Sequence, residues 1–222
     1  MLRFLRREPS AVLLAAQLAA VLLYPFMEGS GAGRALFSLF GILILGLVLL
    51  AVRSTPWLTW LGLALGIPAA ILLLIQTIDG GDALLPYSSA LEAVIYFYAA
   101  AALIAYMLAD HVITRDELFA VGATFTLVAW AFAYTYIVCQ AIEPQSFVAA
   151  KNPDAERTWM ELLFLSFTTL SSTGLSDVVP VKAFARGLVM LEQVAGVGYV
   201  AMVVSRLVGL LVMRPSGEDA RG

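Results

Sequence analysis

Apolar residues occur in long, nearly unbroken runs along the chain, and short polar links separate these runs. A run of about 20 apolar residues is long enough for one helix to cross a bilayer. Six runs are of this order and predict six spanning helices: Pro9 to Met27, Ala35 to Val52, Pro56 to Ile78, Ser88 to Leu108, Leu118 to Ile142 and Val181 to Met213. A further run, Trp159 to Leu170, is too short to cross and is typical of a re-entrant segment. The pattern therefore predicts an all-α membrane protein.

The composition agrees with residence in a membrane. Hydrophobic residues make up 61% of the chain and charged residues 13%, whereas ordinary soluble domains carry about 25% charged residues. The single cysteine, Cys139, lies inside an apolar run, which indicates a free core thiol. With one histidine, His111, and no cysteine cluster, a structural zinc site is not expected. We expect membrane lipids as partners, no nucleic acid and no cofactor.

Basic residues set the expected orientation. Arg3, Arg6 and Arg7 precede the first apolar run, as they would in a signal peptide, but we expect this run to be retained as a helix. With the N-terminus inside, eight basic residues fall on the cytoplasmic side and five outside, in agreement with the positive-inside rule. Both termini are therefore predicted to be cytoplasmic. The frequent alanine, leucine and arginine residues suggest the inner membrane of a bacterium.

A polar link, Ala109 to Glu117, divides the chain into two predicted domains. Residues 1–112 hold four apolar runs with short connections, which is typical of an antiparallel four-helix bundle. The fourth run contains no arginine or lysine and so lacks the gating charges of a voltage sensor. Residues 113–222 predict, in order, a helix over 118–142, a solvated loop over 143–157, a short helix over 158–171, an extended segment over 172–177 and a helix over 181–213. Thr158 and Glu161 have the spacing of a capping box at the start of the short helix.

The most informative stretch of the chain, Phe167 to Pro180, reads FTTLSSTGLSDVVP. Small hydroxyl residues, one glycine, an acid and a proline follow a short amphipathic run, and a long apolar helix comes next. This order resembles the pore helix and selectivity filter of the tetrameric potassium-channel superfamily, whose pattern is Thr-x-x-Thr-hydroxyl-Val/Ile-Gly-Tyr/Phe-Gly-Asp. In such channels, rings of backbone carbonyl oxygens replace the water around a potassium ion. The resemblance implies a homotetramer, because backbone of this kind at membrane depth must be surrounded by protein or water.

The resemblance also assigns roles to individual residues. It implies that potassium ions bind along five consecutive residues: Ser172, Thr173, Gly174, Leu175 and Ser176. The first four would offer backbone carbonyl oxygens, and the Ser172 hydroxyl would add an innermost site. Asp177 matches the acid of the family pattern, and four copies of it would concentrate cations at the outer mouth.

The segment departs from the family pattern at three positions. Leu175 stands in place of an aromatic residue, which removes a hydroxyl that ties the filter to the pore helix. Ser176 replaces a glycine, and a left-handed backbone there would cost about 1 kcal/mol or more in each subunit. Thr173 puts a polar group where an aliphatic one usually packs. Potassium is the first expected ion; weakly selective monovalent conduction, including sodium, and a non-conducting relative are the alternatives.

The last predicted helix extends the resemblance. Ala185 to Leu211 is similar to the inner helix of small bacterial channels. Gly196 falls at the position of the gating hinge in those channels, and Gly198 could share that role. Met202 and Val203 would line the cavity below the filter.

Two acids lie within apolar runs, where ionisable groups are candidates for function. Glu192 is expected to support the filter through a hydrogen bond to Ser166 or Thr169, and proton sensing is the alternative. Glu92 lies near the outer end of its predicted helix and is expected at the interface between membrane and water.

Two other classes of membrane protein agree with the helix count. A transporter built from inverted repeats would show a pairing of halves, and none is visible in the sequence. An intramembrane serine protease would use Ser176 as its nucleophile, but the only histidine, His111, lies in a predicted cytoplasmic link. We therefore expect a channel and no enzymatic activity.

Overall fold

The computed structural model describes residues 8–27, 84–109 and 114–212, together with the short pieces 46–47, 64, 66–69, 71–72 and 75. Within these residues, four helices are long and apolar enough to cross a membrane: α2 (Pro9–Met27), α5 (Leu85–Leu108), α6 (Arg115–Ile142) and α8 (Ala183–Val212). They confirm the first, fourth, fifth and sixth predicted spans. The other two predicted spans, Ala35–Val52 and Pro56–Ile78, lie almost entirely outside the described residues, as does His111.

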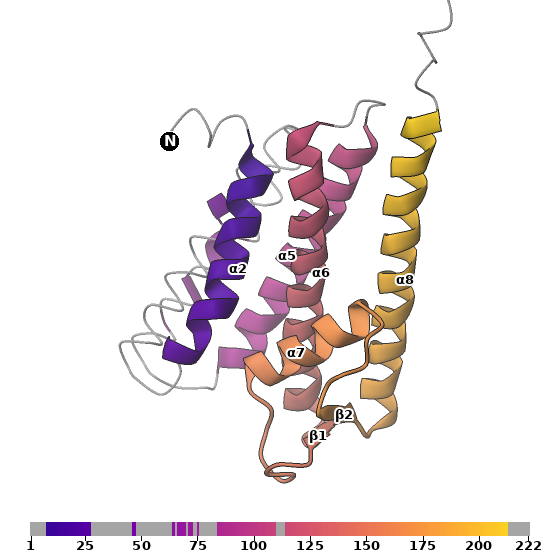
Figure 1. The fold of residues 1–222 in the computed structure, drawn as a ribbon. Helices are drawn as coiled ribbons and strands as arrows, with labels where there is room; N and C mark the ends of the chain where they lie inside the picture. Colours follow the sequence, from indigo (N-terminus) through magenta and orange to yellow (C-terminus); the bar gives the residue numbers. More distant parts are fainter. Residues whose placement is uncertain are drawn as a thin grey trace, which may run out of the picture.

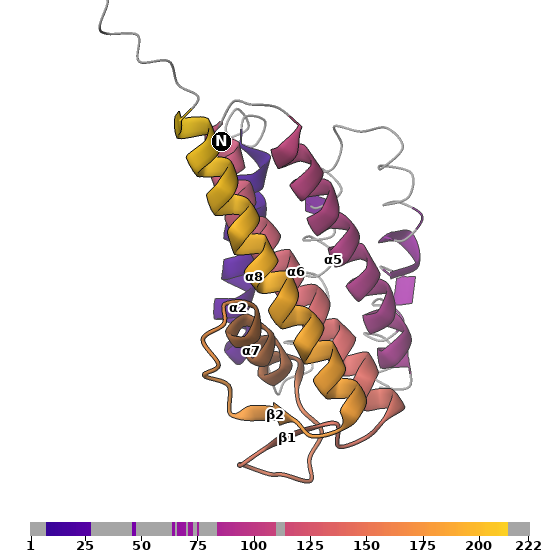
Figure 2. The same ribbon diagram turned by 90° about the vertical axis from the view of Figure 1, so that its right-hand side faces the viewer.

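The four long helices run side by side, and the short elements gather at one end of the bundle (Figures 1 and 2). The short helix α7 (Trp159–Leu170) confirms the predicted short helix within a residue at each end. Strands β1 (Phe147–Ala149) and β2 (Val178–Pro180) pair antiparallel, with Phe147 opposite Pro180. We call residues 143–157 the turret loop and residues 172–177 the filter segment. Strand β1 lies in the turret loop and β2 directly follows the filter segment, so the pairing joins these two segments.

Helix α6 is the centre of the bundle, since it packs against α2, α5, α7 and α8. Its buried side chains include Leu127, Trp130 and Tyr136, which are among the largest fully buried side chains of the structure. The residues of α7 that face α6 are also buried, among them Leu162 and Ser166. The short helix is therefore held by a rigid neighbour over its length.

The polar link is shorter than the sequence predicted. Helix α6 begins at Arg115, and not at Leu118, because Thr114 caps it: the Thr114 hydroxyl accepts a hydrogen bond of 3.2 Å from the Glu117 N–H. Asp116 and Glu117 fall in the first turn, where acidic side chains interact favourably with the helix dipole. Asp116 also accepts two hydrogen bonds of 2.9 Å from Ser10, one from its N–H and one from its hydroxyl, so α2 is fixed to the start of α6.

Helix α8 is joined to α6 by two polar contacts. The Tyr199 hydroxyl donates a hydrogen bond of 2.6 Å to the Val121 carbonyl. Closer to the end of the helix, the Arg206 guanidinium lies 3.2 Å from the Glu117 carboxylate. These contacts hold the far half of α8 against α6, at the end of the bundle opposite to α7.

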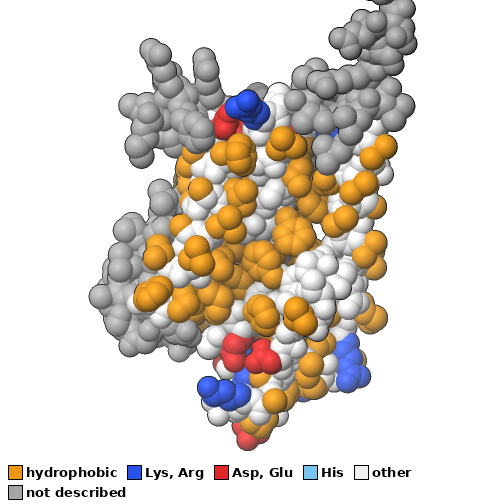
Figure 3. Space-filling model, viewed as in Figure 1, with side chains coloured by type: hydrophobic (Ala, Val, Ile, Leu, Met, Phe, Trp, Pro, Cys, Tyr) orange, Lys and Arg blue, Asp and Glu red, His pale blue; other side chains and the backbone are white. Residues whose placement is uncertain are grey.

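The opposite face of α8 has no neighbour within the described part of this chain. Large apolar side chains project from it at helical spacing: Met190, Leu191, Val194, Val197, Val200, Val204 and Val208. On the surface drawn in Figure 3, hydrophobic side chains cover the middle of the bundle and charged ones gather toward its two ends. An exposed apolar surface of this extent indicates contact with lipid or with other protein chains.

Glu92 is not at the interface where the sequence analysis placed it. The helix begins at Leu85, so Glu92 is its eighth residue and lies one turn deeper than a start at Ser88 would put it. The side chain is only 3% exposed and is hydrogen-bonded to Tyr134 of α6. Tyr96 stacks on Tyr134, with ring centroids 5.7 Å apart, so aromatic residues of α5 and α6 pack against each other.

Candidate functional site

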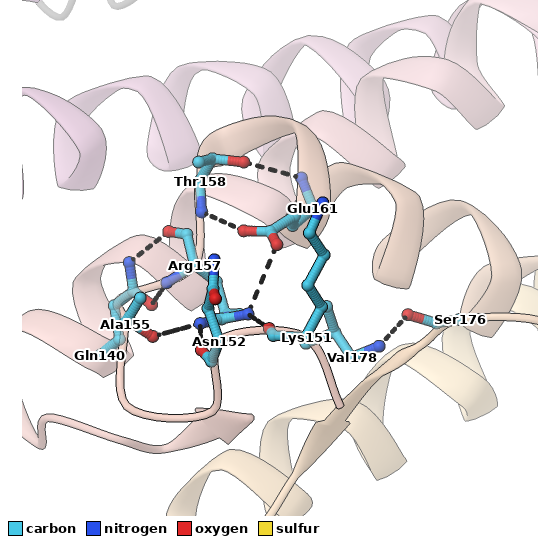
Figure 4. Close-up of polar contacts among 9 residues, drawn as sticks. All are labelled: Gln140, Lys151, Asn152, Ala155, Arg157, Thr158, Glu161, Ser176 and Val178. Atoms are coloured by element: carbon cyan, nitrogen blue, oxygen red, sulfur yellow. Dashed lines mark hydrogen bonds and ion pairs between the residues drawn. The ribbon is translucent and has the colours of Figure 1, made fainter. Parts of the chain in front are cut away.

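The start of α7 is fixed by the predicted capping box. The Thr158 N–H donates a hydrogen bond of 2.7 Å to the Glu161 carboxylate, and the Glu161 N–H donates one of 3.3 Å to the Thr158 hydroxyl (Figure 4). These two contacts satisfy backbone N–H groups that have no partner within the helix. The prediction of a capping box is confirmed, and it determines where α7 begins.

Arg157, the residue before this cap, holds the turret loop in place. It is 4% exposed, and its guanidinium donates hydrogen bonds to three backbone carbonyls of the loop: Lys151, Asn152 and Ala155 (Figure 4). It also lies 3.4 Å from the Glu161 carboxylate. The sequence predicted a solvated loop over 143–157, and for Arg157 this was wrong because the loop folds around its side chain.

Gln140 joins the same arrangement to α6. Its side-chain amide donates a hydrogen bond of 2.9 Å to the Arg157 carbonyl and accepts one of 3.2 Å from the Arg157 N–H. Both backbone groups of Arg157 are thus bound to one side chain of α6. An amide in the last turn of an apolar helix was the only signal for this contact in the sequence.

The filter segment follows the end of α7 through a tight turn. The Thr168 carbonyl accepts hydrogen bonds from the N–H groups of Thr173 (2.9 Å) and Gly174 (3.1 Å). The Ser172 N–H donates one of 3.0 Å to the Thr169 carbonyl. The Thr173 hydroxyl also lies within 3.3 Å of the Thr168 carbonyl. The segment is therefore anchored on the C-terminal end of α7, where the helix dipole places partial negative charge.

Two residues of the filter segment have left-handed backbone. They are Ser172, with φ of 59°, and Gly174, with φ of 64°. Ser176 does not have a positive φ, so the strain expected there is absent. Its hydroxyl instead accepts a hydrogen bond of 3.0 Å from the Val178 N–H, which leads the chain into β2 (Figure 4). Ser172 is therefore the non-glycine residue of this segment that adopts the unfavourable left-handed backbone conformation.

The filter segment lies on the surface of the single chain. Ser172, Thr173 and Gly174 are exposed, and Leu175 is 75% exposed. Asp177 is exposed as well and takes part in no ion pair among the described residues. The structure therefore places the predicted ion-binding residues together on one open edge of the molecule.

Glu192 of α8 lies behind α7 and is fully buried. It accepts hydrogen bonds from the hydroxyl groups of Ser166 on α7 and Tyr136 on α6. The Ser166 hydroxyl also lies 2.8 Å from the Ala129 carbonyl of α6. Three helices thus meet at one carboxyl group. Of the two partners expected for Glu192, the structure brings Ser166 to it, while the contact found for Thr169 is through its backbone carbonyl.

Gly196 allows α8 to approach the end of α7. A Cβ atom at this position would collide with the Leu170 carbonyl oxygen and would lie 2.9 Å from the carbonyl carbon of the same residue. Gly198 has no such neighbour, because no atom of the described residues lies within 4 Å of the position of its Cβ. The close contact explains why position 196 needs glycine, and the hinge role of both residues stays a prediction.

The described residues contain no group of three or more His, Cys, Asp or Glu side chains that could hold a metal ion. Apart from the Asp177 carboxylate, the oxygen atoms of the filter segment are backbone carbonyls and the hydroxyl groups of serine and threonine.

The fold is that of a mostly helical protein in which four of the described helices are long and apolar enough to cross a membrane. A comparison with known families agrees, since the model of a family described as ion channel matches residues 121–213. The match covers most of α6, the turret loop, α7, the filter segment and α8. It confirms the resemblance to the potassium-channel superfamily for this part of the chain and supports a membrane ion channel. No curated protein and no solved structure matches the chain.

Proposed function

We propose that four copies of this chain form a homotetrameric channel that conducts monovalent cations, with potassium as the preferred ion. The observation that carries this proposal is the exposed filter segment, which stands on the C-terminal end of α7 beside the uncovered apolar face of α8. One chain leaves both surfaces open. Four chains around an axis would cover the apolar face and bring four filter segments together.

In this assembly, the ion path runs along the filter segment. Carbonyl oxygens from Ser172 to Leu175, repeated in every subunit, would replace the water around the ion. The hydroxyl groups of Ser172 and Thr173 would add further oxygens. The negative ends of four α7 helices would favour a cation at the inner end of the path.

Asp177 would form the outer mouth of the pore. It is the last residue of the filter segment and is exposed. The nearest basic residue in the sequence, Lys182, is engaged elsewhere, because its ammonium group lies 3.5 Å from the Glu143 carboxylate. Four unpaired carboxylates at one mouth would raise the local concentration of cations.

Weak selectivity among monovalent cations, including sodium, is the second candidate. Leu175 favours weak selectivity for two reasons. Its side chain is 75% exposed in the single chain. A leucine side chain also cannot form a hydrogen bond that would hold the outer part of the filter at a fixed width. The first candidate requires that contacts between subunits fix Leu175 in the assembly. In both cases the channel would lie in a cell membrane with both termini in the cytoplasm.

Potassium release from liposomes tests the proposal. Purified protein, first shown by its mass in detergent to be a tetramer, is reconstituted into potassium-loaded liposomes. We expect release to depend on the protein and to fall severalfold in Asp177→Asn, because a ring of four charges is lost. Glu156→Gln is the matched control, since it removes an exposed turret carboxylate away from the filter segment. A monomer, or a folded tetramer that releases no potassium, would contradict the proposal.

A further inference from the structure

Glu92 is a buried carboxyl group for which ion conduction has no use. It lies on α5, which the family match does not include, and away from the filter segment. At about 1.5 Å per residue, its position is about 10 Å along the helix from Leu85. Helix α5 begins at the end of the bundle where α7 and the turret loop lie (Figure 1). An acid buried within a spanning helix is costly, and it is a candidate for function by default.

The carboxyl group belongs to a polar stripe on the buried face of α5. Ser89, Glu92 and Tyr96 are spaced by three and four residues, so they follow one another on one face of the helix. All three are buried. Tyr134 of α6 faces this stripe and is hydrogen-bonded to Glu92. Trp130, one turn earlier on α6, meets the Tyr96 ring edge to face, with centroids 5.7 Å apart.

Other buried polar side chains lie on this stripe and on the facing helix α6. The hydroxyl groups of Ser89 and Tyr96 and the indole N–H of Trp130 are buried and have no hydrogen-bond partner among the described residues. A carboxylate at Glu92 needs donors, and the Tyr134 hydroxyl can donate to it. A protonated Glu92 is itself a donor, and the same hydroxyl oxygen can accept. The contact with Tyr134 can therefore serve either charge state of the acid.

No described basic residue neutralises Glu92. None of the ion pairs among the described residues includes it. The titratable groups around it are tyrosines: Tyr96 on its own helix, Tyr134 on α6, and Tyr24 on α2, which interacts with Tyr134. The charged groups next to the start of α7, Arg157 and Glu161, are paired with each other. A proton is thus the simplest way for this carboxyl to lose its charge without a large rearrangement.

Trp159 connects this stripe to the pore helix. It is the first residue of α7, and its ring packs against three aromatic rings, those of Trp130 (centroids 5.4 Å apart), Tyr134 (5.9 Å) and Tyr24 (5.2 Å). Two of these rings, Trp130 and Tyr134, also belong to the surroundings of Glu92. A change in the hydrogen bonds of Tyr134 would therefore reach the first turn of α7 through direct ring contact.

We propose that Glu92 is a proton-binding site between α5 and α6, and that Tyr134 and Trp159 transmit its charge state to the start of α7. The binding site does not depend on the proposed function. The effect on current does, because it requires that α7 is the pore helix of a conducting channel.

Tryptophan fluorescence of the purified full chain in lipid nanodiscs tests the proton site without any current. Phenylalanine replaces Trp57 and Trp60, so that the signal comes from Trp130 and Trp159. We expect one sigmoidal change in fluorescence with pH, and we expect Glu92→Gln to abolish it. Tyr134→Phe should raise the apparent proton affinity about tenfold, because it removes a hydrogen bond that the carboxylate accepts. A titration unchanged in Glu92→Gln, or one that disappears only in Glu192→Gln, would overturn the proposal.

Two controls separate a lost site from a failed fold. Glu92→Gln must elute from size exclusion at the position of the unsubstituted protein. Infrared difference spectra then give a second measurement: a C=O band of a protonated carboxyl should be lost as the pH rises, and Glu92→Gln should lack it. If this band is present and unchanged in Glu92→Gln, the proton does not bind at Glu92.

Current across the same pH range tests the transmission to α7. We expect the current of the unsubstituted channel to change severalfold around the fluorescence midpoint, and that of Glu92→Gln to stay constant. A fluorescence titration with a pH-independent current would leave the proton site standing and refute the transmission. Absence of current at every pH would count against the proposed channel, while the fluorescence would still decide the site.

Discussion

Gly196 shows how much depends on one missing methyl group. The helix α8 passes the end of α7 at a distance that leaves no room for a Cβ atom beside the Leu170 carbonyl. The residue directly after Leu170 begins the turn into the filter segment. The packing at Gly196 therefore fixes the position along α8 at which the filter segment begins.

Gly196→Ala should destabilise the protein by about 1–3 kcal/mol, the usual cost of inserting a methyl group into well-packed structure. The obstacle is backbone, which cannot rotate away as a side chain could. Gly198→Ala is the matched control, because its Cβ would lie in open space within the chain. Thermal unfolding of the monomeric chain in a dissociating detergent measures both. Equal midpoints for the two variants would contradict the packing role of Gly196.

Among the non-glycine residues of the filter segment, left-handed backbone lies at Ser172 and not at Ser176. The family pattern has glycine at the position of Ser176, where left-handed backbone would have been costly for serine. The structure has it at Ser172, because the turn that returns N–H groups to Thr168 needs positive φ there. A pattern of residue types predicts which residues make up the filter segment. The conformation of the turn depends on which carbonyl at the end of α7 accepts its hydrogen bonds.

Ser172→Gly should therefore stabilise the folded chain by about 1 kcal/mol, since glycine adopts left-handed backbone without steric cost. Ser171→Gly is the control: Ser171 has φ of −78°, and glycine there should be neutral or destabilising. Chemical unfolding of both variants in mixed micelles measures the difference. A loss of stability in Ser172→Gly would show that left-handed backbone at this position carries no strain.

At the scale of elements, the turret loop and α7 behave as one unit. Arg157 binds the loop carbonyls on one side and Glu161 on the other, while β1 pairs with β2 just beyond the filter segment. Both ends of the segment from α7 to β2 are thus held by the same loop. A disturbance of the loop would reach the filter segment from both directions.

Replacement of Arg157 by alanine should cost about 2 kcal/mol, because three loop carbonyls and one carboxylate lose a charged donor. Lys151→Ala is the matched control, since Lys151 is exposed and offers only its backbone carbonyl to Arg157. Hydrogen exchange should speed up in the turret loop and in the first turn of α7 for Arg157→Ala alone. Equal exchange rates of the turret loop in the two variants would mean that Arg157 does not hold the loop.

The elements themselves could be predicted because their signals are local. Long apolar runs gave four of the six spans within a few residues, and the capping box gave the start of α7. The burial of Arg157 and Glu92 could not be predicted, because it depends on groups that only the fold brings to them. For Arg157 these are loop carbonyls, and for Glu92 it is Tyr134 on another helix.

At the scale of the whole molecule, α6 connects the two predicted halves of the chain. It packs against α2 and α5 on one side and against α7 and α8 on the other. The exposed face of α8 and the exposed filter segment are two surfaces that the described part of a single chain leaves uncovered. A tetramer would give both of them a role, and its formation decides whether the account of the ion path holds.

The reversal potential under bi-ionic conditions tests this account most directly. Purified tetramer in a planar bilayer separates equal concentrations of potassium and sodium chloride. We predict a reversal potential displaced strongly in the direction of potassium selectivity, and Asp177→Asn should lower the conductance while leaving the reversal potential in place. A reversal potential near zero would replace potassium preference by weak selectivity. Silence of folded tetramers, or a current carried by chloride, would contradict the cation channel itself.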